Sequence, residues 1–305
     1  MSVKRLVTII GSRGQLGSDL VRVLQDYAVF EVIPLTREQA DCTDFEAVHK
    51  AVLEIHPDVV VNCAAFVRVD ECEDHPQEAF AVNALGALHV ARACATAGSL
   101  CVHISTDYVF DGSKVSPYKE SDSTHPINVY GASKLSGEYL VRQAAPRWLI
   151  VRSASLFGKT GARGKGGNFV ETILAKAQAA EPLRIVNDVQ MSPTYTRDAA
   201  QALAKLIEAG ADGIVHLTND GACTWFEFAK KALELAGLRA SIDPVSSNQY
   251  PSRARRPANS ALVSERSLVK LRSWQEALEM YLIEKGHRTA SLKDSKRGTA
   301  LGTDG

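Results

Sequence analysis

Residues 6–17 read LVTIIGSRGQLG and are the strongest indication of the fold in this chain. Their first half, Leu6 to Ile10, is apolar and β-rich, which predicts a buried strand. Gly11, Gly14 and Gly17 follow at intervals of three residues. After a strand, such glycines permit a tight turn, let the backbone approach a pyrophosphate, and allow a helix to pack closely. The run therefore predicts a dinucleotide-binding turn, with a plain strand-to-helix turn as the alternative.

Strand and helix patterns alternate from this turn to about residue 152. The predicted strands are 6–10, 30–35, 59–62, 100–105 and 149–152, and the predicted helices are 15–25, 45–55, 76–97 and 129–143. The strands are apolar on both faces, as in a parallel sheet that helices cover on both sides. The alternation predicts an α/β fold of the Rossmann type, with a doubly wound parallel sheet.

The second half of the chain has a looser rhythm, which predicts a smaller C-terminal substrate-binding domain. We predict a Rossmann domain over residues 1–152, with later segments at about 183–215 rejoining its sheet. The substrate domain would then consist of 153–182 and 216–288. The tail, 289–305, is polar and glycine-rich, and we expect it to be disordered because it has nothing to bury.

The composition argues against several classes of partner. The chain has 305 residues, and its 35 basic and 35 acidic side chains give a formal net charge of zero, so we expect no nucleic-acid partner. The apolar runs are shorter than the ~20 residues of a membrane helix, and the N-terminus lacks a signal-peptide pattern. We therefore expect a cytoplasmic protein without a membrane partner. The six cysteines include no CxxC pair, so we expect neither disulfides nor a metal site.

A second informative run is YGASK, which places Tyr130 and Lys134 four residues apart. On a helix they share one face. A free tyrosine has a pKa of ~10, and a nearby ammonium lowers it. Tyr130 could then give a proton to a carbonyl oxygen while a hydride arrives at the carbon. This spacing also occurs by chance on many helix surfaces, so the pair alone has a structural alternative.

Thr106 is the third candidate. It follows the fourth predicted strand, at the carboxyl edge of the sheet where α/β folds bind their ligands. Its hydroxyl could orient a substrate oxygen, although a turn or cap role is the alternative for a lone threonine. Its place upstream of Tyr130 favours the catalytic interpretation.

The residue at the end of the second predicted strand indicates whether the dinucleotide is NAD or NADP. An acid there holds the ribose 2′-OH of NAD, and an arginine accommodates the 2′-phosphate of NADP. Arg37 stands at this place and Arg13 lies in the glycine turn, so the sequence favours NADPH over NADH. The alternative is that both arginines are solvated surface charges. Asp41 follows, and we place it near the adenine.

These runs together resemble the extended short-chain dehydrogenases/reductases and, within them, the dTDP-4-dehydrorhamnose reductase family. The resemblance covers about residues 5 to 285. The matching runs are Gly11 to Gly17, PDVVVNCAA at 57–65, STDYVF at 105–110, NVYGASKLSGE at 128–138, SPTY at 192–195 and RPANS at 256–260.

The resemblance implies that NADPH or NADH reduces the C4 keto group of a nucleotide-linked 6-deoxysugar such as dTDP-4-dehydro-L-rhamnose. It makes Tyr130 the proton donor, Lys134 its partner and Thr106 the orienting hydroxyl, with Asn83 supporting the site through water. The implied cofactor contacts are Gly11, Arg13, Gly14, Gln15, Leu16, Gly17, Arg37, Asp41, Cys42, Ala64, Ala65, Phe66, Tyr130 and Lys134. The implied substrate contacts are Thr106, Asp107, Tyr108 and Ser155.

Two departures from the family pattern leave the sugar open. The family carries a tryptophan where this chain has Ser155, and it tends to carry a histidine where Phe66 stands. The first change removes a stacking surface. Neither change affects the groups that the hydride chemistry needs.

Other functions remain open on the same fold. The 4,6-dehydratases carry a glutamate where this chain has Tyr108, which argues against dehydration. A nucleotide-sugar epimerase stays possible, and so does a non-catalytic regulatory subunit resembling the β subunit of methionine adenosyltransferase. The set of Thr106, Tyr130 and Lys134 favours catalysis. We consider a homodimer as the assembly.

Overall fold

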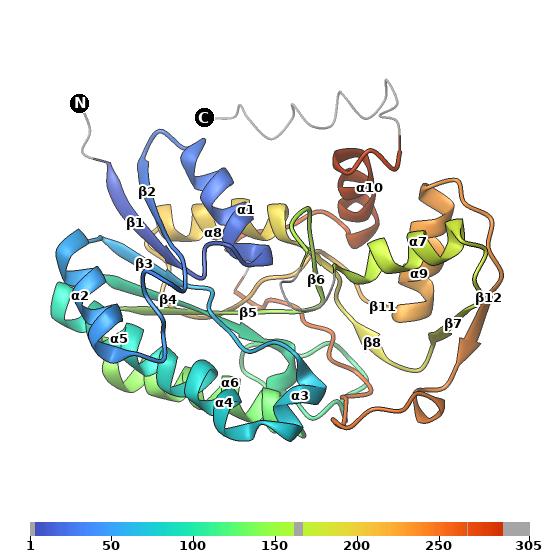
Figure 1. Ribbon diagram of the computed structural model, residues 1–305, viewed down its shortest axis with the longest axis horizontal. Helices are drawn as coiled ribbons and strands as arrows, with labels where there is room; N and C mark the ends of the chain where they lie inside the picture. The colour runs from blue at the N-terminus through green and yellow to red at the C-terminus, as the bar shows by residue number, and fades with distance from the viewer. Residues whose placement is uncertain (1–3, 162–166, 267, 289–305) are drawn as a thin grey trace.

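A six-stranded parallel sheet forms the centre of the protein in the computed structural model, which describes residues 4–161, 167–266 and 268–288 (Figure 1). The strands are β1 (Arg5–Ile10), β2 (Phe30–Leu35), β3 (Val59–Asn62), β4 (Leu100–Thr106), β5 (Trp148–Ser153) and β10 (Gly213–His216). Their order is β10-β5-β4-β3-β1-β2, and every neighbouring pair is parallel. The α/β prediction with a doubly wound parallel sheet is confirmed.

Helices cover both faces of this sheet (Figure 1). One face packs on α1 (Gln15–Gln25) and α8 (Thr196–Glu208), and the other on α2 (Phe45–Ile55), α5 (Gly86–Ala97) and α6 (Val129–Ala144). Alternate strand residues supply the two cores: Val7 and Ile9 face α1 and α8, while Ile10 and Val60 face the other helices. From β1 the chain passes to β2 on one side and then crosses to β3 on the other side of β1, so the switch point lies between β1 and β3.

The helical run Pro76–Ala97 departs from the sequence prediction in two ways. It is divided into α4 (Pro76–Phe80), the π-helix η1 (Ala81–Leu85) and α5. Its 22 residues also have the length and mean hydropathy of a membrane span, although polar residues interrupt its apolar positions. Half of its apolar window is buried in the protein, where α5 packs on α2 and α6. We interpret it as a core helix of the α/β fold.

A second apolar cluster lies beyond the carboxyl edge of the sheet. It is built on α7 (Phe169–Gln178), α9 (Trp225–Leu235) and α10 (Trp274–Glu284), beside the strand pairs β6 (Leu156–Phe157) with β9 (Thr194–Tyr195), β7 (Leu183–Val186) with β12 (Ile242–Val245), and β8 (Gln190–Met191) with β11 (Cys223–Thr224). Its centre is a group of packed rings from Phe157, Tyr195, Phe228 and Tyr281.

The return of the chain to the main sheet differs from the expectation. Only the end of the expected segment, β10, joins the sheet, beside β5. β7 pairs with β12 instead, because the apolar side chains Leu183 and Ile185 pack in the second cluster. The division into two domains stays a prediction, and the tail 289–305 lies outside the described residues.

Candidate active site

The glycine turn after β1 has the geometry of a phosphate site. Gly11 has φ +77°, and a Cβ there would lie 2.8 Å from the backbone nitrogen of Ala64. A Cβ on Gly17 would collide with the carbonyl oxygen of Gly11, so both positions need glycine. Helix α1 starts directly at Gln15 with no side-chain cap and no acid in its first turn. Its first N–H groups are therefore available to an anion.

An unpaired polar atom also indicates that an anionic ligand binds at this turn. The side-chain nitrogen Nε2 of Gln15 is buried and has no hydrogen-bond partner. A buried donor of this kind is costly unless a ligand or water completes it. The turn, the open helix end and this amide together fit the pyrophosphate of a dinucleotide.

Two arginines flank the turn, and each is held by an acid. Arg37 Nε donates to Asp41 Oδ2 at 2.8 Å, and Arg13 Nη1 lies 3.7 Å from Glu38 Oε2. The Arg37 side chain is 80% exposed and the Arg13 side chain 56% exposed. The sequence analysis missed Glu38 as the partner of Arg13. The two guanidiniums are accessible, and a phosphate could compete for them with the carboxylates.

The loop after β3 is hydrogen-bonded through Phe66 to the side chain of Asn83, which lies on η1. The Asn83 Oδ1 atom accepts the Phe66 N–H at 2.8 Å, and its Nδ2 donates to Phe66 O at 3.1 Å and to Ser133 Oγ at 3.0 Å. These bonds attach the loop and α6 directly to Asn83, and its expected role through water stays a prediction. The π-helix η1 carries Asn83, in keeping with the frequent occurrence of such turns at functional sites.

Ala64 and Ala65 lie in this loop, and Cys42 lies against α5. The Ala64 N–H is fixed by Asn62 Oδ1 at 3.1 Å, and Ala65 follows it. Cys42 is buried, and its carbonyl oxygen lies 2.9 Å from His89 Nδ1. Leu16 is also buried, in the core beneath the turn, so its side chain serves packing.

Four candidates meet at the end of β4. Thr106 Oγ1 donates to Asp107 Oδ1 at 2.9 Å and accepts the Tyr108 N–H at 3.2 Å. The hydroxyl of Tyr130 is hydrogen-bonded to the same threonine. The rings of Tyr108 and Tyr130 pack edge to face with centroids 5.9 Å apart. Thr106 is the last residue of β4, Asp107 and Tyr108 begin η2 (Asp107–Val109), and Tyr130 lies on α6. The structure thus brings these four residues together.

Asp107 is a buried acid in this cluster. It is 4% exposed, and its Oδ2 atom has no hydrogen-bond partner. Burial raises the pKa of this carboxyl to about 6, although hydrogen bonds with Ser260 and Thr106 oppose the rise. A carboxyl with this pKa exists in both protonation states near neutral pH.

Lys134 lies on the same helix but its amino group reaches β4. Nζ donates to Ile104 O at 2.6 Å and lies 3.4 Å from His103 Nε2. The side chain is buried, and burial lowers the pKa of this ammonium to about 8. Burial also raises the pKa of Tyr130, while its bond with Thr106 lowers it. Lys134 is not among the main influences on Tyr130, so the expected lowering of the phenol pKa is wrong for the protein without its ligands.

Ser155 occupies a strained connection between β5 and β6. It is a non-glycine residue with φ +43°, and it is half-buried. Its carbonyl oxygen accepts the Thr194 N–H at 3.3 Å. A backbone in the left-handed region is uncommon for residues other than glycine and is often found at binding sites.

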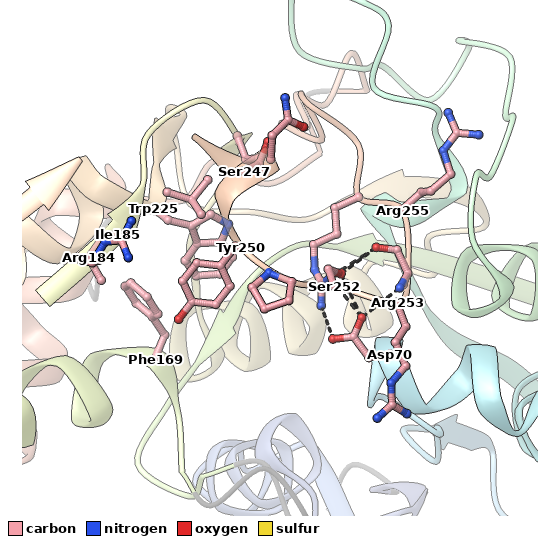
Figure 2. A pocket seen from close by; sticks show the side chains of 16 residues that line it. Asp70, Phe169, Arg184, Ile185, Trp225, Ser247, Tyr250, Ser252, Arg253 and Arg255 are labelled. Atoms are coloured by element: carbon pink, nitrogen blue, oxygen red, sulfur yellow. Dashed lines mark hydrogen bonds and ion pairs between the residues drawn. The ribbon is translucent and has the colours of Figure 1, made fainter. Parts of the chain in front are cut away.

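The sequence analysis missed a cavity of about 630 Å³ (Figure 2). Its lining comes from α7, β7, α9 and the segment 247–256. Figure 2 shows Phe169, Trp225 and Tyr250 gathered at one end, and the rings of Phe169 and Trp225 lie 4.8 Å apart. The lining arginines are Arg184, Arg253, Arg255 and Arg256. The basic run SRARRP at 252–257 was the available sequence signal.

Arg256 connects this cavity to the cluster around Thr106. Its guanidinium holds Asp70 Oδ2 at 2.8 Å and is hydrogen-bonded to Tyr108. Tyr108 in turn packs on Tyr130. The contacts of Arg256 with Tyr108 and of Tyr108 with Tyr130 therefore connect the lining of the cavity to the Thr106 cluster.

Comparisons with known proteins agree on one family. The family described as RmlD substrate binding domain matches residues 5–286. The spore coat polysaccharide biosynthesis protein SpsK of Bacillus subtilis is 40% identical over 92% of this chain and 97% of its own length. The dTDP-4-dehydrorhamnose reductase of Mycobacterium tuberculosis is 39% identical over 94% and 95%.

A solved structure extends the likeness to three dimensions. The dTDP-4-dehydrorhamnose reductase of Bacillus anthracis, solved in complex with NADP, has a TM-score of 0.87 and 36% identity, covering 92% of this chain and all of that one. The match spans both the sheet and the second apolar cluster. The chain therefore belongs to the dTDP-4-dehydrorhamnose reductase family of extended short-chain dehydrogenases/reductases.

Proposed function

We propose that this chain uses NADPH to reduce the C4 keto group of a nucleotide-linked 6-deoxysugar, namely dTDP-4-dehydro-L-rhamnose to dTDP-L-rhamnose. The observation that carries the proposal is the hydrogen bond between Tyr130 and Thr106 at the carboxyl edge of the sheet. The names of the relatives support this substrate, and the NADP in the Bacillus anthracis structure supports the cofactor.

Each residue of the site has its own role in the proposed reaction. NADPH supplies the hydride when it is bound. Tyr130 donates a proton to the oxygen at C4, Thr106 orients this oxygen, and Lys134 binds the nicotinamide ribose through its ammonium. Gly11 to Gly17 and the uncapped start of α1 bind the pyrophosphate. Arg13 and Arg37 bind the 2′-phosphate, which favours NADPH over NADH.

The cavity of Figure 2 is proposed to receive the nucleoside diphosphate of the substrate. Arginine guanidiniums bind phosphates through paired, charge-assisted hydrogen bonds, and aromatic rings stack on bases. The cavity has both, with Trp225 and Tyr250 at one end and Arg253 and Arg255 towards the other, and Arg256 is also part of its lining. The connection from Arg256 to Tyr108 and Tyr130 would place the sugar at the proton donor.

The assembly and location are part of the proposal. We place the enzyme in the cytoplasm as a homodimer, with no nucleic-acid or membrane partner. The zero net charge supports the absence of nucleic acid. Leu85 on η1 and Tyr139 on α6 are 49% and 53% exposed on neighbouring helices, which supports a homodimer at this face. Light scattering on the purified protein measures the mass, and a monomer at all concentrations would exclude the dimer.

The direct test is an assay of NADPH and NADH oxidation against a panel of 4-keto sugar nucleotides. The panel includes dTDP-4-dehydro-L-rhamnose and dTDP-4-keto-6-deoxy-D-glucose. We expect stoichiometric oxidation of NADPH with the first. NAD retained through purification, together with epimerisation and no net oxidation, would replace the reductase with an epimerase. No turnover with any panel member, together with capture of one enzyme partner, would favour a regulatory subunit.

A further inference from the structure

Asn128 uses both ends of its side-chain amide, and the two ends hold different parts of the site. Its Oδ1 atom accepts the Gly131 N–H at 2.7 Å and so caps α6, the helix that carries Tyr130. Its Nδ2 atom donates to the backbone oxygen of Arg255 at 2.8 Å. Only one orientation of the amide fits both partners, because an N–H needs an oxygen and a carbonyl needs a donor. Asn128 is 7% exposed, so the two bonds are shielded from water.

The acceptor Arg255 belongs to the segment 252–256, which lines the cavity of Figure 2. Three of its five residues are arginines, and the proposed function places the diphosphate of the substrate at their guanidiniums. Tyr130 lies between Asn128 and Gly131, within the capped turn. One amide therefore joins the segment that would bind the ligand to the turn that carries the proton donor.

Helix α3 (Val69–Asp74) joins the same two parts from another side. Asp70 Oδ1 accepts the Ala254 N–H of the cavity segment at 3.0 Å. Glu73 Oε1 accepts the Val129 N–H at 2.8 Å, at the first residue of α6. Asp70 and Glu73 are three residues apart, so they lie on one face of α3. The cavity segment and the start of α6 are therefore connected twice, directly and through α3.

We propose that Asn128 is a positioning residue that sets the place of Tyr130 against a substrate held in the cavity. The inference rests on the proposed function, which puts the diphosphate at segment 252–256 and the keto sugar at Tyr130. The diphosphate fixes the segment, the carbonyl of Arg255 fixes the amide of Asn128, and the capped turn holds Tyr130. Proton transfer needs Tyr130 within hydrogen-bond distance of the C4 oxygen, so a small displacement of this turn is costly.

The test separates the two bonds of the amide. Asn128→Ser keeps an oxygen that caps a helix but is too short to reach Arg255 O, and Asn128→Asp keeps the cap but has no N–H to donate. In both variants, single-turnover hydride transfer from bound NADPH should slow by ~10–100-fold, the cost of a misplacement of about 1 Å. The affinities for NADPH and for dTDP alone should change much less than this rate. Wild-type rates in both variants would overturn the proposal.

A control variant separates positioning from loss of stability. Ser273→Ala removes the cap of α10, where the serine hydroxyl accepts the Glu276 N–H at 3.3 Å. This change should lower the urea midpoint and leave the rate of hydride transfer unchanged. The urea midpoint of Asn128→Ser should stay close to that of the wild type, because its cap is kept. Equal slowing of hydride transfer in Ser273→Ala and Asn128→Ser would show a general effect of destabilisation and would overturn the proposal.

A measurement without turnover tests the link alone. Calorimetry measures the binding of dTDP to the wild type and to Asn128→Ser, and hydrogen exchange is followed at the Gly131 N–H. In the wild type, bound dTDP should slow this exchange, because a fixed segment 252–256 holds the amide that caps the turn. In Asn128→Ser, dTDP should bind and leave the exchange unchanged. Equal slowing in the two proteins, or no slowing in a wild type that binds dTDP, would overturn the inference.

Failure of the proposed function would give different results. A wild type that does not bind dTDP would contradict the nucleotide assignment of the cavity, and this inference with it. Binding of dTDP with slowed exchange at Gly131, but no oxidation of NADPH by any keto sugar, would contradict the proposed reduction. That result would still support the link from the cavity through Asn128 to the turn of Tyr130.

Discussion

The carboxylate of Glu138 holds the guanidinium of Arg152 in a two-point ion pair, with Oε1 to Nε at 2.9 Å and Oε2 to Nη2 at 2.7 Å. Both side chains are 3% exposed. Glu138 Oε1 also accepts the hydroxyl of Ser105 at 2.5 Å. The pair therefore ties α6, which carries Tyr130, to β4 and β5, and it fixes the distance between the helix and the strand that ends in Thr106.

Breaking this ion pair should cost much more than breaking a surface pair. Glu138→Leu leaves the Arg152 charge buried and alone, so we expect the free energy of unfolding to fall by ~3–5 kcal/mol. The double variant Glu138→Leu with Arg152→Met should recover part of this loss. Urea denaturation measures the effect. As a matched control, Lys231→Ala breaks a surface pair with Glu234 and should leave the midpoint unchanged. A single Glu138 variant as stable as the wild type would contradict the role of the pair.

Lys134 should make the stability depend on pH in a defined window. Burial lowers the pKa of its ammonium from 10.5 to about 8, so the unfolded chain binds more protons between these values. The free energy of unfolding of the wild type should therefore rise with pH over this range, relative to that of Lys134→Met, by roughly 3 kcal/mol in total. Denaturant titrations at several pH values measure the difference. A difference that is constant with pH would mean that Lys134 is not desolvated.

Arg37 should discriminate between the two cofactors. Its guanidinium is exposed and shared with Asp41, beside the glycine turn. If it binds the 2′-phosphate, Arg37→Ala should weaken NADPH by ~10–100-fold, the usual value of a charge-assisted bond, and leave NADH nearly unchanged. Fluorescence titration measures both affinities. Arg92→Ala, an exposed arginine on α5, serves as the control. Equal losses for the two cofactors would remove Arg37 from this role.

Tyr250 should affect the binding of the substrate alone. Its ring lines the cavity and is 58% exposed, so its removal should not disturb the core. We expect Tyr250→Ala to raise KM for the nucleotide sugar by about 2- to 10-fold through the loss of a stacking surface, with kcat and NADPH binding unchanged. Leu268→Ala removes another apolar side chain, which is 47% exposed and lies outside the cavity lining, and it should have no effect on KM. Similar KM values for the two variants would show that the cavity does not hold the base.

Local signals were sufficient to predict the N-terminal half of the fold. The bounds expected for the first two helices, 15–25 and 45–55, agree with α1 and α2, and those of the strands 30–35 and 59–62 agree with β2 and β3. Three of these elements follow a local boundary signal, namely Gly14, Pro57 and the capping residue Asp44, whose side chain accepts the Ala47 N–H. Such signals lie within a few residues of the element.

The features that sequence missed depend on contacts between distant segments. The π-helix η1 is stabilised by Asn83, whose amide bonds to Phe66 and to Ser133 on another helix. The cavity joins Phe169 to Trp225, which are far apart in the chain. The direction of Lys134 was also missed, since the spacing from Tyr130 places both on one helix but does not say which carbonyl its amino group reaches.

In the proposed reaction, Tyr130 gives its proton to the C4 oxygen. The most direct measurement is single-turnover oxidation of bound NADPH by dTDP-4-dehydro-L-rhamnose in the wild type and in Tyr130→Phe, which keeps the ring and removes only the hydroxyl. We predict that the variant binds NADPH as the wild type does but transfers hydride ~10²–10⁴-fold more slowly, the usual contribution of a positioned acid. Hydride transfer at the wild-type rate in Tyr130→Phe would contradict the account.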